Sequence, residues 1–168
     1  IRAQHGKEEK MRRIDREVTD SSELLEIMRR CDVCRLALND DDGFPYVVAL
    51  NFGICEREGK IGLVFHSALS GHKIDLMKSD SRAAFEMDCD HELQYFENKG
   101  YCTMSYASVA GKGRIHMLTG DEKVAALRQL MDQYHPAEHA YFSPAAIDRT
   151  AVYRLEIESM TGKRKLPK

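Results

Sequence analysis

The sequence predicts a mainly β (α+β) protein in which a few helices flank a sheet or barrel. Many short apolar runs are separated by clusters of Gly, Asp and Asn, a pattern typical of antiparallel strands. Only three segments carry apolar residues at helical spacing. The length of 168 residues fits one domain that buries a core of its own. Many strands with few helices favour a β-barrel or α+β domain over a doubly wound sheet.

The first half of the chain is expected to hold one helix and three strands. These are a helix at about Ser21–Arg30 and strands at Val33–Leu38, Tyr46–Phe52 and Ile61–Phe65. The segment Asp20–Glu23 resembles a capping box, which marks the start of the helix. Turn-forming residues at 39–43 predict an antiparallel hairpin between the first two strands, and residues 56–60 form a second turn. We therefore expect the three strands to form a meander.

The second half is expected to alternate helices and strands less regularly. It should contain a short helix at Lys73–Lys78, strands at Ala83–Asp88, Tyr101–Val109, Gly113–Leu118 and Ala151–Ile157, and a long helix from Asp121 to about His135. Val124, Leu127 and Leu130 supply the apolar stripe of the long helix. The segment Ala110–Lys112 is expected to separate the two strands on either side of it.

The composition excludes several classes of protein. Apolar residues make up 43% and charged residues 31%, with a net charge of -2, which indicates a folded globular chain. The only short basic run is Lys163–Lys165, so a nucleic-acid partner is not expected, and no apolar run is long enough for a membrane span. The charged beginning lacks the apolar core of a signal peptide, so we expect a cytoplasmic protein. Residues 1–10 are expected to be an N-terminal extension or cloning remnant, and residues 11–168 one domain.

Five cysteines, an odd number, argue against a framework of disulfides. Only Cys31 and Cys34 have the spacing of metal ligands or a redox pair, and a zinc ribbon would need a second close pair. Cys34 alternates with polar and small residues at the start of an expected strand. These thiols are therefore predicted to pack as small apolar side chains rather than to bind a metal.

The segment Phe65–Lys73 is the best candidate for a binding site. It places a hydroxyl (Ser67), a glycine (Gly71) and a lysine (Lys73) between an expected strand and an expected helix. Free backbone N–H groups, the helix dipole and the ammonium group would all attract an anion at this junction. The spacing alone is a weak pattern, because a lysine just inside a helix is usually a solvated charge.

Several segments occur in an order that resembles a known family. They are Cys31–Asn39, Tyr46–Gly53, the loop Phe65–Lys73, Tyr106–Gly113 and Thr161–Lys163. The ordered set is similar to the nitroimidazole-resistance (Nim) branch of the pyridoxamine 5′-phosphate oxidase-like flavoproteins, although no single segment is specific. The resemblance extends from Met11 to Lys165.

The resemblance implies a homodimeric, FMN-binding split β-barrel with two flavin mononucleotides at the subunit interface. In that family the loop holds the flavin phosphate, which assigns this role to Ser67 and Lys73, with Gly71 and His72 shaping the approach of the backbone. The other implied or expected contacts with the cofactor are Val48, Leu50, Asn51, His66, Ala68, Ser108, Val109, Lys163 and Arg164. Of these, Lys163 and Arg164 are expected to reach the flavin across the dimer interface.

A flavin would supply the electron chemistry, and His66 is the candidate proton donor because a histidine titrates near neutral pH. The resemblance thus implies an FMN-dependent oxidoreductase similar to a 5-nitroimidazole reductase. His66 fits a purely structural role equally well. Pyridoxamine 5′-phosphate oxidase activity itself is not expected, because the chain has no Trp and lacks the C-terminal signature of that enzyme. A haem-binding or haem-degrading barrel and a non-catalytic flavin-binding module remain as alternatives.

Overall fold

The computed structural model describes residues 12–136 and 141–167, so the expected extension at residues 1–10 lies outside the described part. The helices are η1 (Ile14–Arg16), α1 (Ser21–Arg30), α2 (His72–Ser79), η2 (Glu97–Lys99), α3 (Gly120–Tyr134) and α4 (Pro144–Asp148). The strands are β1 (Glu17–Val18), β2 (Cys34–Asn39), β3 (Pro45–Leu50), β4 (Gly53–Arg57), β5 (Lys60–Ala68), β6 (Arg82–Phe96), β7 (Tyr101–Leu118) and β8 (Thr150–Lys165). Among the described helices, none is both long and apolar enough to cross a lipid bilayer.

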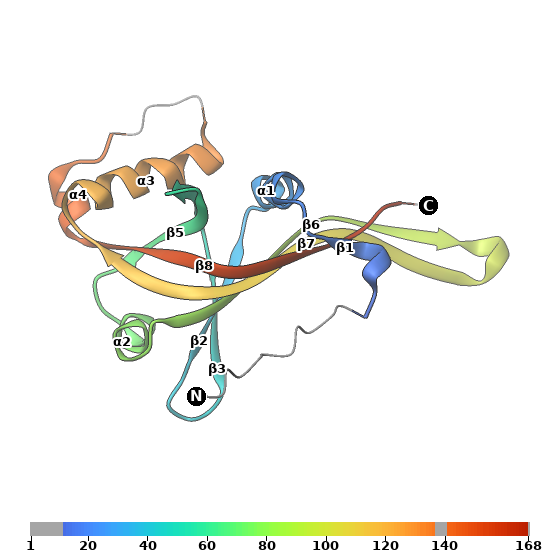
Figure 1. Cartoon of the computed structure of the whole chain (residues 1–168), viewed down its shortest axis with the longest axis horizontal. Coiled ribbons are helices and arrows are strands. Elements are labelled where there is room, and N and C mark those ends of the chain that lie inside the picture. The colour runs from blue at the N-terminus through green and yellow to red at the C-terminus, as the bar shows by residue number, and fades with distance from the viewer. Residues whose placement is uncertain (1–11, 137–140, 168) are drawn as a thin grey trace, which may run out of the picture.

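One antiparallel sheet contains all eight strands, in the order β3-β2-β6-β7-β8-β5-β4, with β1 paired to β8. The edge strands β3 and β4 are joined by only two residues, Asn51 and Phe52. Three Cα–Cα steps of about 3.8 Å allow at most about 11 Å between the joined ends. The sheet must therefore curl until its two edges approach each other, which gives an open, split barrel flanked by helices (Figure 1). The predicted fold class is confirmed.

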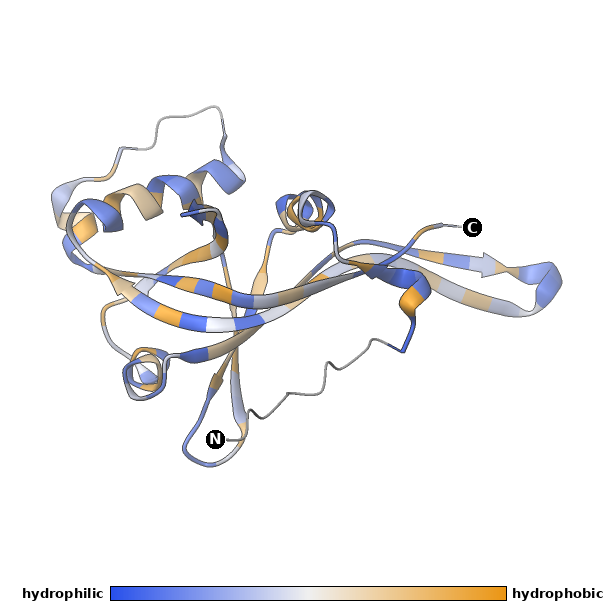
Figure 2. Cartoon of the chain, viewed as in Figure 1, coloured by the Kyte–Doolittle hydropathy of each residue, from blue (hydrophilic) through white to orange (hydrophobic). Residues whose placement is uncertain are grey.

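Two cores hold the helices against the curled sheet (Figure 2). The main core receives buried side chains from α1 and α2 and includes Phe52, Phe65 and Tyr153. The second core lies under α3, where Leu127 and Leu130 pack with Val64 and Val152. The three predicted helices, α1, α2 and α3, are thus each fixed by buried apolar side chains at helical spacing.

The start of α1 shows why that helix was predictable. The Asp20 carboxylate accepts hydrogen bonds from the backbone N–H groups of Ser22 (3.0 Å) and Glu23 (3.1 Å), as an N-cap residue does. At the other end of the helix, Cys31 and Cys34 are buried in the main core. Burial raises the pKa of the Cys34 thiol to about 12. Both residues pack as the small apolar side chains that the sequence predicts.

The expected three-stranded meander is wrong. The hairpin of β2 and β3 forms as predicted, with Leu36 opposite Val48, but β3 ends at Leu50 and a separate strand, β4, begins at Gly53. β5 pairs with β4 and β8 and not with β3. The only sequence sign of the break is Asn51, because the apolar Phe52 follows it directly and makes the segment read as one continuous strand.

The expected break at Ala110–Lys112 is also wrong, because β7 runs without interruption through it. A Cβ atom at Gly113 would overlap the backbone carbonyl of Glu156, and one at Gly111 would lie 2.6 Å from the Phe85 ring. These glycines permit close contact with β8 and with the core, beside a register shift between Lys112 and Gly113. They do not form a turn.

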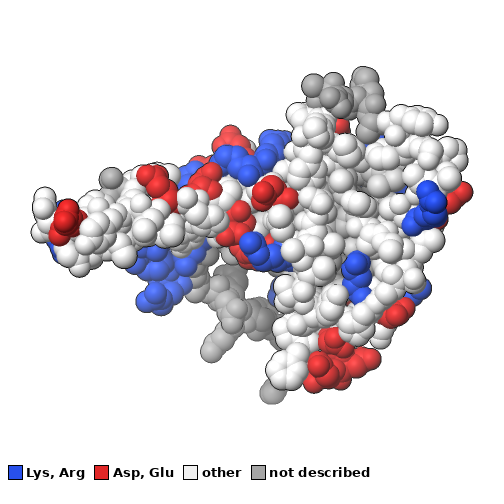
Figure 3. Space-filling model, turned by 180° about the vertical axis from the view of Figure 1, so that it is seen from behind, with Lys and Arg blue, Asp and Glu red and all other residues white. Residues whose placement is uncertain are grey.

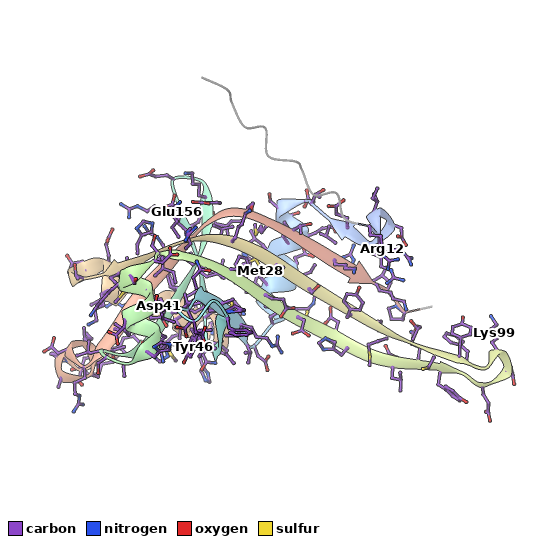
Figure 4. All side chains as sticks on the ribbon, turned by 90° about the horizontal axis from the view of Figure 1, so that it is seen from below. Arg12, Met28, Asp41, Tyr46, Lys99 and Glu156 are labelled. Atoms are coloured by element: carbon purple, nitrogen blue, oxygen red, sulfur yellow. The ribbon has the colours of Figure 1, made fainter. Side chains whose placement is uncertain are left out.

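The strands β6, β7 and β8 are longer than expected, with 15, 18 and 16 residues. The far ends of β6 and β7 form a hairpin, Glu92–Ser105, that projects from the body and carries Lys99 near its tip (Figures 1 and 4). We call this hairpin the arm. Its side chains Leu93 and Tyr95 are 64% and 68% exposed, although both are apolar or aromatic.

Candidate functional site

The predicted anion-binding loop connects the end of β5 to the start of α2. Gly71 is the N-cap residue of α2 and has φ of 129°, and a Cβ atom there would meet nothing within 4 Å. The half-buried Lys73 lies in the first turn of α2, and within the described residues no ion pair of its ammonium group is seen. A helix N-terminus, open space beside a glycine and an unpaired lysine therefore come together as predicted.

Ser67 and His66 are neighbours in β5 whose side chains leave opposite faces of the sheet. Ser67 lies on the face of Phe65, towards the main core, and its hydroxyl donates a hydrogen bond to the Ala68 carbonyl oxygen (3.0 Å). His66 lies on the other face, the face of Val64. Any ligand that touches both residues must therefore lie across the end of β5, where Ala68 is exposed.

His66 is exposed on one side and packed on the other. It stands opposite Val152, a residue of the second core. This partial burial lowers the pKa of the His66 imidazole, because a charged ring loses solvation there. At neutral pH the ring is accordingly mostly neutral in the ligand-free protein.

His72 joins the anion-binding loop to the hairpin of β2 and β3. Its Nε2 atom lies 2.7 Å from the Asp40 carboxylate, and its ring meets that of Tyr46 edge-on with centroids 5.1 Å apart. The carboxylate raises the pKa of His72, and the same hydrogen bond lowers that of Asp40. In Figure 4 the turn marked by Asp41 and Tyr46 lies beside α2. His72 thus contacts the strand expected to carry the flavin ring.

The residues expected beside the flavin ring lie along β3 and just beyond it. Val48 and Leu50 turn their side chains towards the main core, so only their backbone groups can face a ligand at this edge of the sheet. The exposed Asn51 follows in the two-residue link to β4. An edge strand offers unpaired N–H and C=O groups, which suits hydrogen bonds to a planar heterocycle.

The remaining predicted contacts lie far from the loop within one chain. Ser108 pairs with Lys163 near the end of β8, whereas Ser67 pairs with Ala151 at its beginning. Twelve residues of extended strand correspond to roughly 40 Å before curvature is allowed for. These two groups can meet at one ligand only if a second copy of the chain contributes one of them.

Two of these distant residues already have structural roles. Arg164 forms an ion pair with Glu23 in the first turn of α1 (3.1 Å), and Val109 is fully buried in the main core. Lys163 is half buried, and no ion pair of its ammonium group is seen in the described part of the chain. Lys163 is therefore the better candidate for a ligand contact.

Tyr153 is a residue that the sequence reasoning missed. It is fully buried in the main core, its ring stacks on Phe65 with centroids 5.7 Å apart, and its hydroxyl has no hydrogen-bond partner among the described residues. Burial raises the pKa of Tyr153 to about 12, and the Ser67 hydroxyl, which lies on the same face of the sheet two residues beyond Phe65, partly offsets this rise. In the sequence Tyr153 is one more apolar position of an alternating strand, so no signal was available.

The chain matches a known protein family over most of its length. The pyridoxamine 5′-phosphate oxidase family matches residues 20–164. The chain belongs to the pyridoxamine 5′-phosphate oxidase family. No curated protein sequence matches this family member.

Solved structures share the fold of this pyridoxamine 5′-phosphate oxidase family member. A candidate 5-nitroimidazole antibiotic resistance protein from Bacteroides thetaiotaomicron is 26% identical, with a TM-score of 0.77 over 88% of this chain and 85% of that chain. The FAD and heme binding protein from Mycobacterium smegmatis is 20% identical, with a TM-score of 0.74 over 90% and 74%. The flavocytochrome Anf3 from Azotobacter vinelandii is 18% identical, with a TM-score of 0.74 over 94% and 72%. The chain therefore has the flavin-binding split-barrel fold of the family.

Proposed function

We propose that this protein is a cytoplasmic, FMN-dependent oxidoreductase that reduces nitro groups or related small molecules. The observation that carries the proposal is the cradle formed by Ser67, Gly71 and Lys73 at the end of β5, on a chain of a flavin-binding fold. The candidate nitroimidazole resistance protein, at 26% identity, supports the choice of substrate class.

The residues present fit the phosphate of FMN. A phosphate monoester carries nearly two negative charges and three acceptor oxygens. Lys73 and the Ser67 hydroxyl would bind these oxygens, and the backbone N–H groups that begin α2 would add donors. The isoalloxazine ring would lie along the free edge of β3, against the backbone of Val48 and Leu50 and beside Asn51.

When bound, FMN supplies the transfer of hydride or electrons, whereas the chain binds it and manages protons. His66 would hold the proton that a nitro group consumes on reduction, at its imidazole ring beside the cradle. Burial lowers the pKa of His66 and so favours the neutral ring. A negative charge bound nearby would raise this pKa again, and the ring would then carry the proton needed for donation.

The proposal includes a homodimer with FMN in the interface. Two observations support it. Ser108 and Lys163 lie roughly 40 Å from Ser67 along β8, so a shared site needs two chains. The exposed apolar side chains of the arm, and a broad region of the body with few charged groups in Figure 3, offer surface for a partner.

The decisive experiment is an absorption spectrum of the isolated protein, followed by reduction with a nicotinamide donor in the presence of a nitroimidazole. We expect a flavin spectrum and consumption of the nitro compound. A protein that takes up no flavin would overturn the proposal. Flavin without turnover of any nitro compound would instead favour a non-catalytic flavin-binding module.

The same spectrum tests a haem-binding function, which two relatives of similar fold suggest because they combine flavin with haem. A Soret band would support it. Three histidines are candidate axial ligands for haem: His66, His91 and His135. His91 already forms an ion pair with Asp88 (2.7 Å), and His135 lies at the C-cap of α3. His66 lies beside the cradle, where FMN is proposed to bind, so haem would compete for the same place.

Replacing Lys73 tests the phosphate assignment directly. Lys73→Ala is expected to weaken FMN binding by about 1.5–3 kcal/mol, the usual contribution of a hydrogen bond to a charged group. Riboflavin, which lacks the phosphate, should bind both proteins equally. Lys78→Ala, which removes an exposed lysine from the last turn of the same helix, is the matched control and should leave both affinities unchanged. Equal losses for FMN and riboflavin would contradict the assignment.

A further inference from the structure

The fully buried hydroxyl of Tyr153 has no hydrogen-bond partner among the described residues of the ligand-free protein. A buried O–H without a partner is unfavourable, because it has lost its bonds to water and gained none. The phenyl ring alone would fill the same space against Phe65. Such a group points to a function that is fulfilled only when something binds nearby.

The sheet register determines what lies next to this hydroxyl. Tyr153 stands opposite Phe65, and Ser67 is two residues further along β5 on the same face. Diagonal neighbours across antiparallel strands lie within reach of a tyrosine side chain. The effect of the Ser67 hydroxyl on the titration of Tyr153 agrees with that placement.

Ser67 itself is only weakly engaged. Its hydroxyl donates to the carbonyl oxygen of the next residue, Ala68, at 3.0 Å, and this local bond can be exchanged by a rotation of one side-chain torsion. A serine hydroxyl has one proton and two lone pairs. It can therefore accept from one neighbour while it donates to another.

We propose that Tyr153 is a positioning residue of the phosphate cradle: its hydroxyl donates to Ser67 Oγ, so that Ser67 directs its own proton to a phosphate oxygen of the ligand. The inference rests on the proposed function and deepens it. The second of these hydrogen bonds is donated by the Ser67 hydroxyl. It therefore suits a phosphate, which only accepts hydrogen bonds, and should increase the affinity for FMN over that for riboflavin.

The high pKa of Tyr153, about 12, makes this phenol a permanent donor. It keeps its proton at every pH at which the protein would act, and this proton has no other acceptor among the described residues, which favours donation to Ser67 Oγ. Lys73 attracts the phosphate by charge, whereas Tyr153 and Ser67 contribute orientation.

The test uses Tyr153→Phe, which removes only the hydroxyl. Without ligand, the variant should unfold at the same or a higher urea concentration than the parent protein, because the lost group had no partner. Its affinity for FMN should fall roughly five- to tenfold, and its affinity for riboflavin should not change. Ser67→Ala should lower FMN affinity as well, and the double variant should bind FMN no worse than Ser67→Ala alone.

Tyr134→Phe is the matched control, because that hydroxyl is fully engaged in the free protein. It accepts from the backbone N–H of Phe52 (3.1 Å) and donates to the Asp32 carbonyl oxygen (2.9 Å). Its loss should lower stability and leave the ratio of FMN to riboflavin affinity unchanged. Equal weakening of FMN and riboflavin in Tyr153→Phe, or no weakening of either, would overturn the inference.

Inorganic phosphate separates this inference from the proposed function. If the parent protein takes up no FMN, the proposed function fails, and stabilisation by inorganic phosphate then tests the cradle alone. A thermal shift by phosphate that shrinks in Tyr153→Phe would still support the relay through Ser67. A parent protein that responds to neither FMN nor phosphate would overturn both proposals.

Discussion

His72 Nε2 lies 2.7 Å from the Asp40 carboxylate and so connects the first turn of α2 with the turn between β2 and β3. The His72 side chain is exposed and that of Asp40 is partly buried, and the two join segments that are 32 residues apart in sequence. The hydrogen bond raises the pKa of His72 and lowers that of Asp40. It therefore makes the stability of the cradle depend on pH.

Asp40→Asn should reduce stability in one window of pH. The raised pKa of His72 contributes stability that is complete below the ordinary histidine pKa of about 6.5 and is lost as pH rises through the raised value. The lowered pKa of Asp40 contributes stability above about pH 4 that is lost as pH falls. The difference in urea midpoint between parent and variant should thus be largest between about pH 4 and 6.5. A difference that does not vary with pH would contradict the ion pair.

His66→Ala tests the proton role without disturbing the anchor. Because His66 and Ser67 face opposite sides of β5, the variant should retain FMN affinity. Turnover of a nitro compound should fall roughly 100-fold, the lower end of the usual contribution of a general acid. The lowered pKa of His66 also predicts that the parent rate rises as pH falls below 6.5, and that the variant loses this rise. Equal turnover by both proteins would assign His66 a structural role.

Lys163 and Arg164 are adjacent residues that should respond differently to substitution. Lys163→Ala should weaken FMN binding, because its ammonium group is available to a second chain. Arg164→Ala should leave FMN binding unchanged and lower the free energy of unfolding by at most about 1 kcal/mol, since its pair with Glu23 is partly exposed. Point variants are needed here, because truncation after Ser159 would remove the part of β8 that pairs with β7 and β1. Identical FMN affinity in Lys163→Ala would remove that residue from the site.

Gly113→Ala should be among the most damaging substitutions in the chain. Its Cβ atom would overlap the backbone carbonyl of Glu156, which cannot rotate away as a side chain would. We expect a loss of about 3 kcal/mol or more in unfolding free energy, or failure to fold. Gly43→Ala, where φ is 85° but the space is open, should cost only about 1 kcal/mol. Similar losses in the two variants would mean that β7 and β8 can separate locally.

The parts of the fold that local chemistry specifies could be predicted from the sequence. α1 begins at Ser21 because the side chain of Asp20 caps it. β2 and β3 pair as a hairpin because turn-forming residues lie between them. The pairing of β7 with β8 could not be predicted, since the glycines of β7 respond to the backbone of a strand more than 40 residues later. A glycine in a sequence can indicate a turn or a close approach of another segment. The sequence does not show which of the two applies.

The candidate site also combines residues that local sequence places with a residue that only the strand pairing places. Gly71 and Lys73 are close neighbours along the chain, so their spacing was sufficient to place both at the N-terminus of α2, just after Ser67 at the end of β5. Tyr153 reaches Ser67 only through the pairing of β5 with β8. Its unpaired hydroxyl is a property of the packed core, and no sequence pattern records it.

The two-residue link at Asn51 and Phe52 bears on how the protein avoids aggregation. Exposed edge strands invite strands of other molecules to pair with them. Here β3 and β4 are joined at one end by the two-residue link, while their outer ends carry Pro45, which has no N–H to donate, and the charged Arg57. A foreign strand needs a continuous row of free backbone groups, whereas a planar heterocycle needs only a few. The same edge can therefore admit a small ligand and resist amyloid-like association.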